Sequence, residues 1–345
     1  MLTVYSKKHR LRDSKGEIHG GEIVPPFECP RRADIVLDRI NAVGLGEVIE
    51  PKDYGLDPVH AVHDAGYVSF LSTCWDEWVA EGFGGEAIAT SWPGRTMNAP
   101  HIPRNIDGKV GYYALASETS ISEGTWEAAL ASKDVALEAT EHVLAGNGAA
   151  FGLCRPPGHH AARDQFGGYC FLNNAAIAAQ HARAKGAERV AILDVDFHHG
   201  NGTQDIFYDR DDVFFLSLHG DPLDAFPYFL GHRDEVGTGK GAGFTANYPM
   251  PPGTEYSAWK AALQDALDRI AKAKCDFLVV SLGTDTFKDD PISFFKLGSD
   301  DFTDYGALLA GLNLPTVFLL EGGYAVDDIG VNVVNTLTGF ENALR

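Results

Sequence analysis

The stretch RVAILDVDFHHGNGTQ, residues 189–204, decides the fold of this chain. Residues 190–193 form a short apolar run rich in β-branched side chains, which is typical of a strand buried on both faces of a parallel sheet. Two aspartates and two histidines follow, namely Asp194, Asp196, His198 and His199. Open α/β sheets place their chemistry at the carboxyl ends of such strands, and residues two apart share a face. We therefore expect a functional site here, with Asp196 and His198 facing one ion.

Strands and helices alternate through the carboxyl-terminal half of the chain. The pattern predicts further strands at residues 149–154, 213–218, 277–282 and 316–320. It predicts helices at residues 175–185, 256–274, 305–312 and 327–337. Such alternation indicates βαβ units, and therefore a central, mostly parallel sheet with helices on both faces. Because no segment reads as a linker, we predict a single α/β domain over residues 1–345.

The amino-terminal part of the chain is less regular. We expect a first strand at residues 2–5, a loop rich in Gly and Pro at 18–30, and amphipathic helices at 31–43 and 62–81. Residues 82–111 hold Gly, Pro, Arg and His without clear periodicity, and helix resumes at 112–146 with a break near Gly124. A loop this long inside a compact domain is usually functional. We expect it to be a substrate wall, a lid or an oligomer contact, with disorder as the alternative.

Composition excludes some partners and favours others. The net charge of -20 disfavours nucleic acid, which needs clustered Lys and Arg, and is compatible with a cationic substrate. Five cysteines without a CxxC spacing indicate a reducing compartment, so we predict a cytoplasmic protein. The first residues become charged too early for a signal peptide. No apolar run approaches the roughly 18 residues of a transmembrane helix, so we expect no membrane partner.

Polar side chains end four of the predicted strands. They are His159 and His160, Asp196 and His198, Asp285, and Tyr324. The carboxyl ends of parallel strands lie along one edge of a sheet, so these side chains should converge. A single aspartate there is more often a loop hydrogen bond, but Asp196, His198 and Asp285 together can hold a divalent ion with open positions. Zn²⁺ fits this donor set best, and Fe²⁺ could use the same ligands.

The neighbouring residues suit acid–base chemistry beside a metal. Imidazoles at His159 and His160 titrate near neutral pH and can move protons, although two structural histidines would give the same pattern. A metal lowers the pKa of a bound water. The phenol of Tyr324 could donate to a developing oxyanion, with a packed surface aromatic as the alternative. Asp194 shares the face of Asp196, where it could orient a histidine or hold a monovalent cation.

Six motifs resemble those of the zinc-dependent deacetylases and occur in that family's order. They are RPPGHHA (155–161), FGGYCFLNNAAIAA (166–179), ILDVDFHHGNGTQDIF (192–207), SLHGD (217–221), SLGTDTF (281–287) and EGGY (321–324). The family includes histone deacetylases, acetoin-utilisation proteins and acetylpolyamine amidohydrolases. Four other segments most resemble the bacterial acetylpolyamine amidohydrolases, namely GGEIVPPFECPRRAD, GEAIATSWP, IPRNIDGKVGYY and DPISFFKL.

The resemblance implies a role for each residue of the predicted site. The implied ligands of a single zinc ion are Asp196, His198 and Asp285. His160 would be the general base, and His159, partnered by Asp194, would act electrostatically or as an acid. Tyr324 would polarise the acetyl carbonyl and stabilise the tetrahedral intermediate. Asn201 stands where some family members have Asp, and a neutral partner should leave His160 less basic.

The resemblance also bears on other metals. The implied ligands of a structural potassium ion are Asp194, Asp196, His198, Ser217 and Leu218, partly through backbone carbonyls. A second monovalent site is implied around Phe207, Arg210 and Val213. The implied fold is shared with arginases, which bind two manganese ions. The arginase pattern would need carboxylates at positions 200 and 283, where this chain has Gly200 and Gly283. A single-zinc amidohydrolase is therefore favoured over a ureohydrolase.

We expect a narrow tunnel to the site, because aromatic walls suit an alkyl chain that ends in an acetamide. The expected lining residues are Phe166, Gly167, Gly168, Tyr169 and Phe226. Asp107 and Glu118 could meet a distal ammonium of a polyamine, or could be ordinary solvated carboxylates. The resemblance further suggests that the loop at 82–111 helps to form a homodimer and narrows the entrance.

The sequence thus predicts a zinc amidohydrolase that removes acetyl groups from a small cationic acetylated polyamine. One alternative keeps the chemistry but acts on acetyl-lysine in peptides or proteins. Another alternative, of a different class, is a non-catalytic module that binds acetylated amines. This last alternative is disfavoured because no catalytic position is missing.

Overall fold

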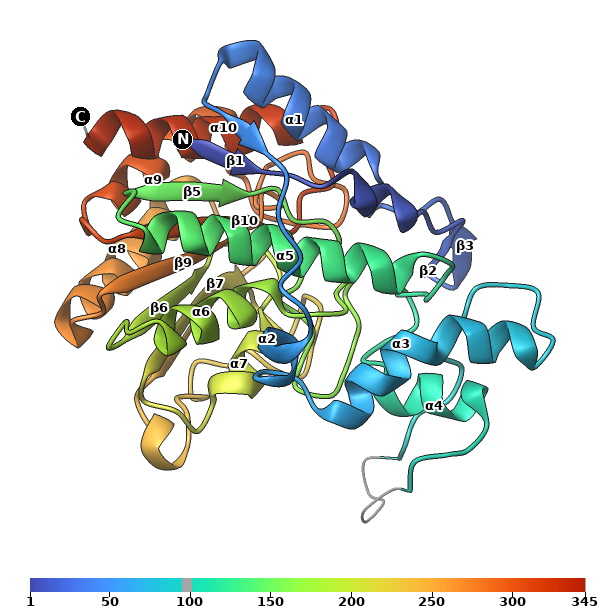
Figure 1. Cartoon of the computed structure of the whole chain (residues 1–345). Coiled ribbons are helices and arrows are strands. Elements are labelled where there is room, and N and C mark those ends of the chain that lie inside the picture. Colours follow the sequence, from blue (N-terminus) through green and yellow to red (C-terminus); the bar gives the residue numbers. More distant parts are fainter. Residues whose placement is uncertain (95–100, 345) are drawn as a thin grey trace.

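An eight-stranded sheet runs through the middle of the molecule (Figure 1). The strands are β1 (Leu2–Val4), β4 (Val48–Ile49), β5 (Ala149–Gly152), β6 (Val190–Asp194), β7 (Val213–Gly220), β8 (Thr245–Met250), β9 (Phe277–Leu282) and β10 (Thr316–Leu320). Their order is β4–β1–β5–β10–β9–β6–β7–β8, with every neighbouring pair parallel. The computed structural model describes residues 1–94 and 101–344, and over them the predicted parallel α/β fold is confirmed.

Helices cover both faces of this sheet. One face packs against α5 (Thr125–Leu144) and α6 (Asn174–Ala184). The other face packs against α1 (Arg31–Val43), α8 (Tyr256–Ala273), α9 (Ser299–Ala310) and α10 (Ile329–Leu344). The remaining helices are α2 (Asp57–His60), α3 (Ala65–Ala80), α4 (Ile106–Tyr113) and α7 (Asn201–Phe207). None of the helices in the described ranges is long and apolar enough to cross a membrane.

The central strand β6 is buried on both faces, as the apolar run predicts. Val190 and Ile192 belong to the core on the α5 and α6 face. Ala191 and Leu193 belong to the core on the opposite face. This alternation of neighbours is the geometry of a strand, whose successive side chains point to opposite sides. The strand therefore delivers Asp194 and the residues after it to the carboxyl edge of the sheet.

The structure departs from the sequence prediction at two edge strands and around the long loop. Two edge strands, β4 and β8, are missed, and β8 reads TANYPM, whose polar residues and proline hide a strand that only an edge tolerates. The predicted helical stretch at 112–146, broken near Gly124, corresponds to the end of α4 at Tyr113 and to α5, which begins at Thr125 after its Gly124 cap; residues 114–124 are not helical. The last residues of the predicted loop at 82–111 belong to α4, whose Asn105 cap accepts the Asp107 N–H at 2.9 Å. Residues 95–100 of that loop lie outside the described residues.

The segments missing from the central sheet gather at one side of it. The hairpin of β2 (Glu17–His19) and β3 (Glu22–Val24) lies beyond the carboxyl end of β5, and α3 and α4 lie on the same side (Figure 1). The hairpin turns at Gly20 and Gly21, both with positive φ. These segments surround the edge at which the polar strand ends meet.

Candidate active site

The structure brings Asp196, His198 and Asp285 together at the carboxyl edge of the sheet. Their potential ligand atoms all lie within 4.8 Å of one another, and all three residues are buried. His198 Nδ1 lies 2.9 Å from Asp285 Oδ2 and 3.3 Å from Asp196 Oδ1. Residues from two separate strand ends, β6 and β9, therefore form one compact donor cluster.

Backbone amides fix both carboxylates of this cluster. Asp196 accepts the N–H of Gly322 at 2.7 Å through Oδ2 and the N–H of His198 at 2.8 Å through Oδ1. Asp285 Oδ1 accepts the N–H of Phe197 at 2.7 Å. The loops after β6, β9 and β10 are thereby interlocked. Because the main chain orients the two carboxylates, their remaining lone pairs are preorganised toward one point.

The donor set fits a zinc ion. Burial alone would lower the pKa of His198, but its hydrogen bonds to Asp196 and Asp285 raise it to about 10. Two buried carboxylates around one imidazole thus demand a positive charge, which a divalent cation supplies. One imidazole nitrogen and two carboxylate groups are zinc ligands, and three protein ligands leave positions for water and substrate. A closed structural site would use four.

The two carboxylates that the second metal of an arginase would need do not fit in this chain. A side chain at Gly283 would collide with the Asp196 carboxylate, and one at Gly200 would collide with Asp194 Oδ2. These are the two positions at which the arginase pattern needs carboxylates. The backbone therefore passes directly against the ligands of the first site, which supports the single-metal interpretation.

His159 and His160 lie side by side next to this cluster, with ring centroids 4.0 Å apart. His159 Nδ1 lies 2.9 Å from Asp194 Oδ2, and His160 Nδ1 lies 2.6 Å from Asn201 Oδ1. Burial opposes a charge on His159, but the carboxylates of Asp194 and Asp196 raise its pKa well above the usual range. Burial, followed by the charge of His159, holds the pKa of His160 well below the usual range. These surroundings therefore shift the pKa values of the two neighbouring imidazoles in opposite directions.

A buried glutamate that the sequence reading overlooked holds the histidine loop in place. Glu321 Oε2 accepts the N–H of Gly158 at 2.6 Å and the N–H of His159 at 3.1 Å. Burial raises the pKa of Glu321 to about 7. The residue opens the EGGY motif, so its position was visible, but nothing in the motif says that its side chain reaches the loop after β5.

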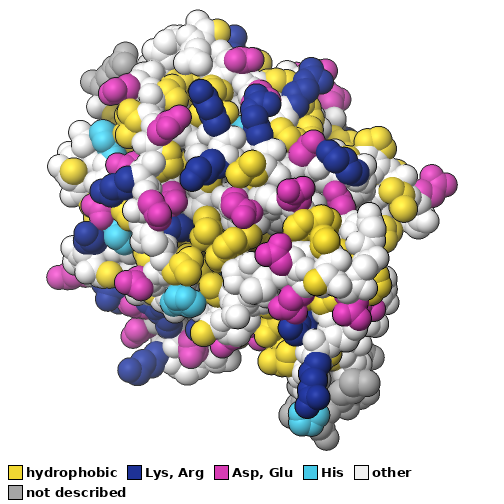
Figure 2. All heavy atoms as spheres, turned by 45° about the vertical axis from the view of Figure 1, so that its right-hand side comes forward, with side chains coloured by type: hydrophobic (Ala, Val, Ile, Leu, Met, Phe, Trp, Pro, Cys, Tyr) yellow, Lys and Arg dark blue, Asp and Glu magenta, His cyan; other side chains and the backbone are white. Residues whose placement is uncertain are grey.

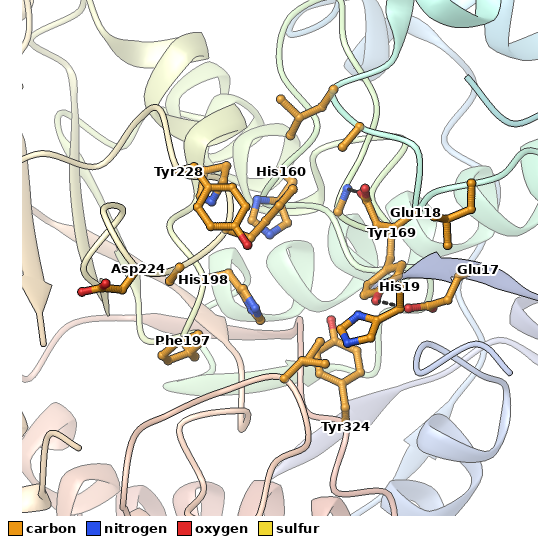
Figure 3. A pocket seen from close by; sticks show the side chains of 18 of the residues that line it. Glu17, His19, Glu118, His160, Tyr169, Phe197, His198, Asp224, Tyr228 and Tyr324 are labelled. Atoms are coloured by element: carbon orange, nitrogen blue, oxygen red, sulfur yellow. Dashed lines mark hydrogen bonds between the residues drawn. The ribbon is translucent and has the colours of Figure 1, made fainter. Parts of the chain in front are cut away.

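A cavity of about 570 Å³ leads to these residues (Figure 3). His160, His198 and Tyr324 line its inner end, and its walls are mainly apolar. The aromatic lining residues besides Tyr324 are Tyr169, Phe197, Phe226, Tyr228, Phe229 and Phe294. The acidic lining residues are Glu17, Glu118 and Asp224. No Lys or Arg is among the described residues that line it, so the cavity suits an aliphatic cation.

Most of the predicted tunnel residues do line the cavity. Gly168, Tyr169, Phe226 and Glu118 are among them. Glu118 Oε1 accepts the Gly168 N–H at 2.9 Å. Gly168 has a φ of +53°, and a side chain there would collide with the His160 ring, so this wall requires glycine.

Three of the predicted residues, Phe166, Gly167 and Asp107, do not line the cavity. Phe166 is fully buried and stacks between Phe70 and Phe171, at centroid distances of 6.0 and 5.9 Å, so it lies behind the wall. Asp107 sits in the first turn of α4, where a carboxylate is favourable beside the helix amino terminus, and it does not line the cavity. Phe166 was expected at the wall because it is close in sequence to residues that line it. Asp107 was expected there because it is an acidic residue of the long loop.

Glu17 is the acidic wall residue that was hardest to predict from the sequence. Its Oε1 accepts the Tyr169 hydroxyl at 2.9 Å, drawn as a dashed line in Figure 3, and its Oε2 accepts the Phe27 N–H at 3.1 Å. Burial raises the pKa of Glu17 to about 7. In the same view Glu17 and Glu118 lie on one side of the cavity and Asp224 on the other. A Gly-Gly hairpin signal at Gly20 and Gly21 was the available clue.

The residues expected around monovalent cations fall into two groups. Ser217 pairs with Asp194 in the β6–β7 ladder, and the adjacent Leu218 is buried. The second group runs from Phe207 at the end of α7, through Arg210, to Val213 at the start of β7. The Arg210 N–H donates to the Phe207 carbonyl at 3.0 Å. The residues of each group are therefore close together, and the first group includes Asp194, which binds His159.

Comparison with known proteins agrees with this geometry. The histone deacetylase domain matches residues 26–340. The acetylpolyamine amidohydrolase of Mycoplana ramosa is 57% identical, covering 98% of this chain and 99% of that protein. Acetylpolyamine amidohydrolase 1 of Pseudomonas aeruginosa is 54% identical, covering 100% of both chains. A crystal structure of acetylpolyamine aminohydrolase from Burkholderia pseudomallei superimposes with a TM-score of 0.95 at 41% identity, covering 100% of this chain and 99% of that one.

Proposed function

The chain belongs to the histone deacetylase family, and we propose that it is a zinc-dependent amidohydrolase that removes acetyl groups from acetylated polyamines. The observation that carries this proposal is a cavity with aromatic and acidic walls that ends at the Asp196, His198 and Asp285 cluster. The names of the similar proteins support the same substrate class.

The walls match the chemistry of such a substrate. An alkyl chain can lie between Tyr169 and Phe226, with its acetamide at the inner end of the cavity. An ammonium further along the chain can meet the carboxylates of Glu17 and Glu118. Asp224, on the opposite wall, adds to the negative potential that attracts cations. A neutral or anionic amide would not be attracted by these acidic residues.

The catalytic roles follow from the hydrogen bonds. Zinc held by Asp196, His198 and Asp285 would supply a Lewis acid and a water of lowered pKa. His160 Nδ1 faces the Asn201 amide oxygen and therefore carries the ring proton, which leaves a lone pair on Nε2 to accept the proton of the attacking water. The low pKa of His160 keeps that lone pair free at neutral pH.

The other two groups act on developing charge and on the leaving group. The hydrogen bond to Asp194 and the negative charge of that residue favour the protonated form of His159, which can stabilise negative charge or donate a proton to the departing amine. The Tyr324 hydroxyl faces the cavity and donates a hydrogen bond to the oxyanion of the tetrahedral intermediate. In this proposal His160 is the general base, and His159 stabilises charge or acts as the general acid.

We further propose a structural potassium ion near Asp194 and Ser217, and a second near the α7–β7 connection. The ladder pairing of Asp194 with Ser217 supports the first site. A cytoplasmic location is also proposed, and five free cysteines support it because reducing compartments keep thiols unpaired.

A homodimer is proposed as well, with the loop at 82–111 as a contact. Trp92 is 42% exposed and Ile102 is 53% exposed, so this segment offers two large apolar side chains to a contact. Figure 2 shows further hydrophobic side chains between the charged ones on one face of the molecule. Analytical ultracentrifugation of the chain and of a variant with Trp92→Ser and Ile102→Ser tests this contact.

The decisive test compares kcat/KM for acetylputrescine and for an acetyl-lysine peptide on zinc-loaded protein. We expect a strong preference for the free amine, because the walls are narrow and acidic. Equal or better turnover of the peptide would replace the polyamine assignment by lysine deacetylation. Zinc-loaded, folded protein that is inert toward both substrates would point to a binding module.

A further inference from the structure

One buried carboxylate, that of Asp290, holds the backbone of Tyr324. Asp290 Oδ2 accepts the Tyr324 N–H at 2.7 Å and the Ala325 N–H at 3.2 Å. Its Oδ1 accepts the N–H of Ile292 at 3.0 Å. A single side chain therefore ties the loop after β10 to the loop after β9. The second of these loops also carries Asp285 and the wall residue Ile292.

The Tyr324 hydroxyl has no anchor of its own. Over residues 1–94 and 101–344, no group donates to it or accepts from it. The ring is bounded by the Arg32 guanidinium, 4.8 Å from its centroid, and by the edge-on ring of Tyr169 at 5.6 Å. Gly323 precedes it with a φ of +128°, and its carbonyl accepts from Arg32 Nε at 2.7 Å. Backbone anchors therefore decide where the hydroxyl stands.

Arg32 and Asp290 bind different groups of that backbone. Arg32 binds the carbonyls of Glu321 and Gly323, before the tyrosine, whereas Asp290 binds the amides of Tyr324 and Ala325. Arg32 also lies against the Tyr324 ring, but only Asp290 binds the backbone amide of the tyrosine. An amide side chain in place of Asp290 would present one accepting oxygen and an NH₂ group that cannot accept.

We propose that Asp290 is a positioning residue for the Tyr324 hydroxyl, acting through the amides of Tyr324 and Ala325. Among the described residues, its carboxylate accepts hydrogen bonds from backbone amides and from none of the proposed metal ligands. The inference rests on the proposed function for one point, the use of the Tyr324 hydroxyl as oxyanion donor. Substituting Asp290 should therefore lower kcat by no more than removing the Tyr324 hydroxyl does, because Asp290 acts only by placing that hydroxyl.

The test is a double-mutant cycle of Asp290→Asn with Tyr324→Phe, with Asp289→Asn as the matched control because Asp289 is adjacent and exposed. Loss of one oxyanion donor costs about 10²- to 10³-fold in kcat, so Tyr324→Phe sets the ceiling. We expect Asp290→Asn to lower kcat about tenfold, as partial misplacement of a catalytic group does, with KM within about twofold. In the Tyr324→Phe background the same change should cost less than about twofold.

Two results would overturn the proposal. One is an undiminished loss from Asp290→Asn in the Tyr324→Phe background, because the residue would then act through Asp285 or the fold. The other comes from hydrogen exchange, which needs no substrate. We expect the Tyr324 and Ala325 amides to exchange faster in Asp290→Asn than in Asp289→Asn, and unchanged exchange would refute the anchor. Wild-type protein inert toward every acetylated amine would end the proposed function but leave this exchange result decisive.

Discussion

The inner end of the cavity and its rim are built on different principles. At the inner end, buried carboxylates bind the main-chain amides of neighbouring loops, as Asp196 does with Gly322 and Asp285 with Phe197. At the rim, the walls are loops with exposed apolar side chains, such as Tyr228 at 54% and Phe229 at 81%. Rigid interlock fixes the reacting geometry, whereas rim loops leave room for the substrate chain to vary.

This contrast assigns chemistry to the inner end and selectivity to the rim. Changes at the inner end should act on kcat or on metal content, because the groups there touch the reacting atoms. Changes at the rim should act on the choice between substrates and leave the reaction itself intact. The predictions below test that division, beginning with the largest expected effect.

Asp285→Ala should abolish turnover and metal binding together. The change removes one of three protein ligands and leaves Asp196 and His198 as a buried pair, so the site should lose zinc. Zinc content by mass spectrometry and turnover of acetylputrescine measure the outcome. Asp289→Ala, on the same loop but exposed, serves as the control and should keep both. A variant that retains full activity without its carboxylate would break the assignment of this cluster as the metal centre.

Gly168→Ala should lower kcat by about 10- to 100-fold, because the new methyl group collides with the His160 ring and displaces the base. The matched control is Gly239→Ala, at a position that does not line the cavity. Gly239 has a similar φ, +54° against +53°, but nothing lies within 4 Å of a methyl group there. Both changes strain the backbone alike, so only the collision distinguishes them. Equal losses in the two variants would show that strain, not displacement of His160, is responsible.

The inner end was predictable because a strand pattern and short motifs define it. The run at 190–193 located β6, and the polar residues at four strand ends converge because parallel strands end at one edge. The interlocking contacts were not predictable. Glu321 reaches the His159 loop and Asp290 reaches Tyr324 across 162 and 34 residues, and no local pattern encodes such pairings.

The rim was predicted less well, for a physical reason. Its walls come from a hairpin, a loop after β7 and a loop after β9, whose side chains face the cavity only through tertiary packing. Phe166 and Tyr169 are close in sequence, yet only Tyr169 lines the cavity. Glu17 was overlooked because a carboxylate in a Gly-rich stretch reads as solvated, whereas the fold buries it against Tyr169.

The smallest expected effect is a pH dependence of substrate choice. Burial raises the pKa of Glu17 to about 7, with Glu118 and Glu28 adding to the rise and the Tyr169 hydrogen bond opposing it. The carboxyl is neutral below that pH and charged above it, so attraction for a distal ammonium should grow as pH rises. We expect kcat/KM for acetylputrescine, divided by that for the uncharged N-butylacetamide, to increase about threefold between about pH 6 and pH 8. The ratio cancels the titration of the catalytic histidines, which both substrates share. In Glu17→Gln the ratio should stay flat, and a rise equal to that of the wild type would remove Glu17 from the selectivity of the rim.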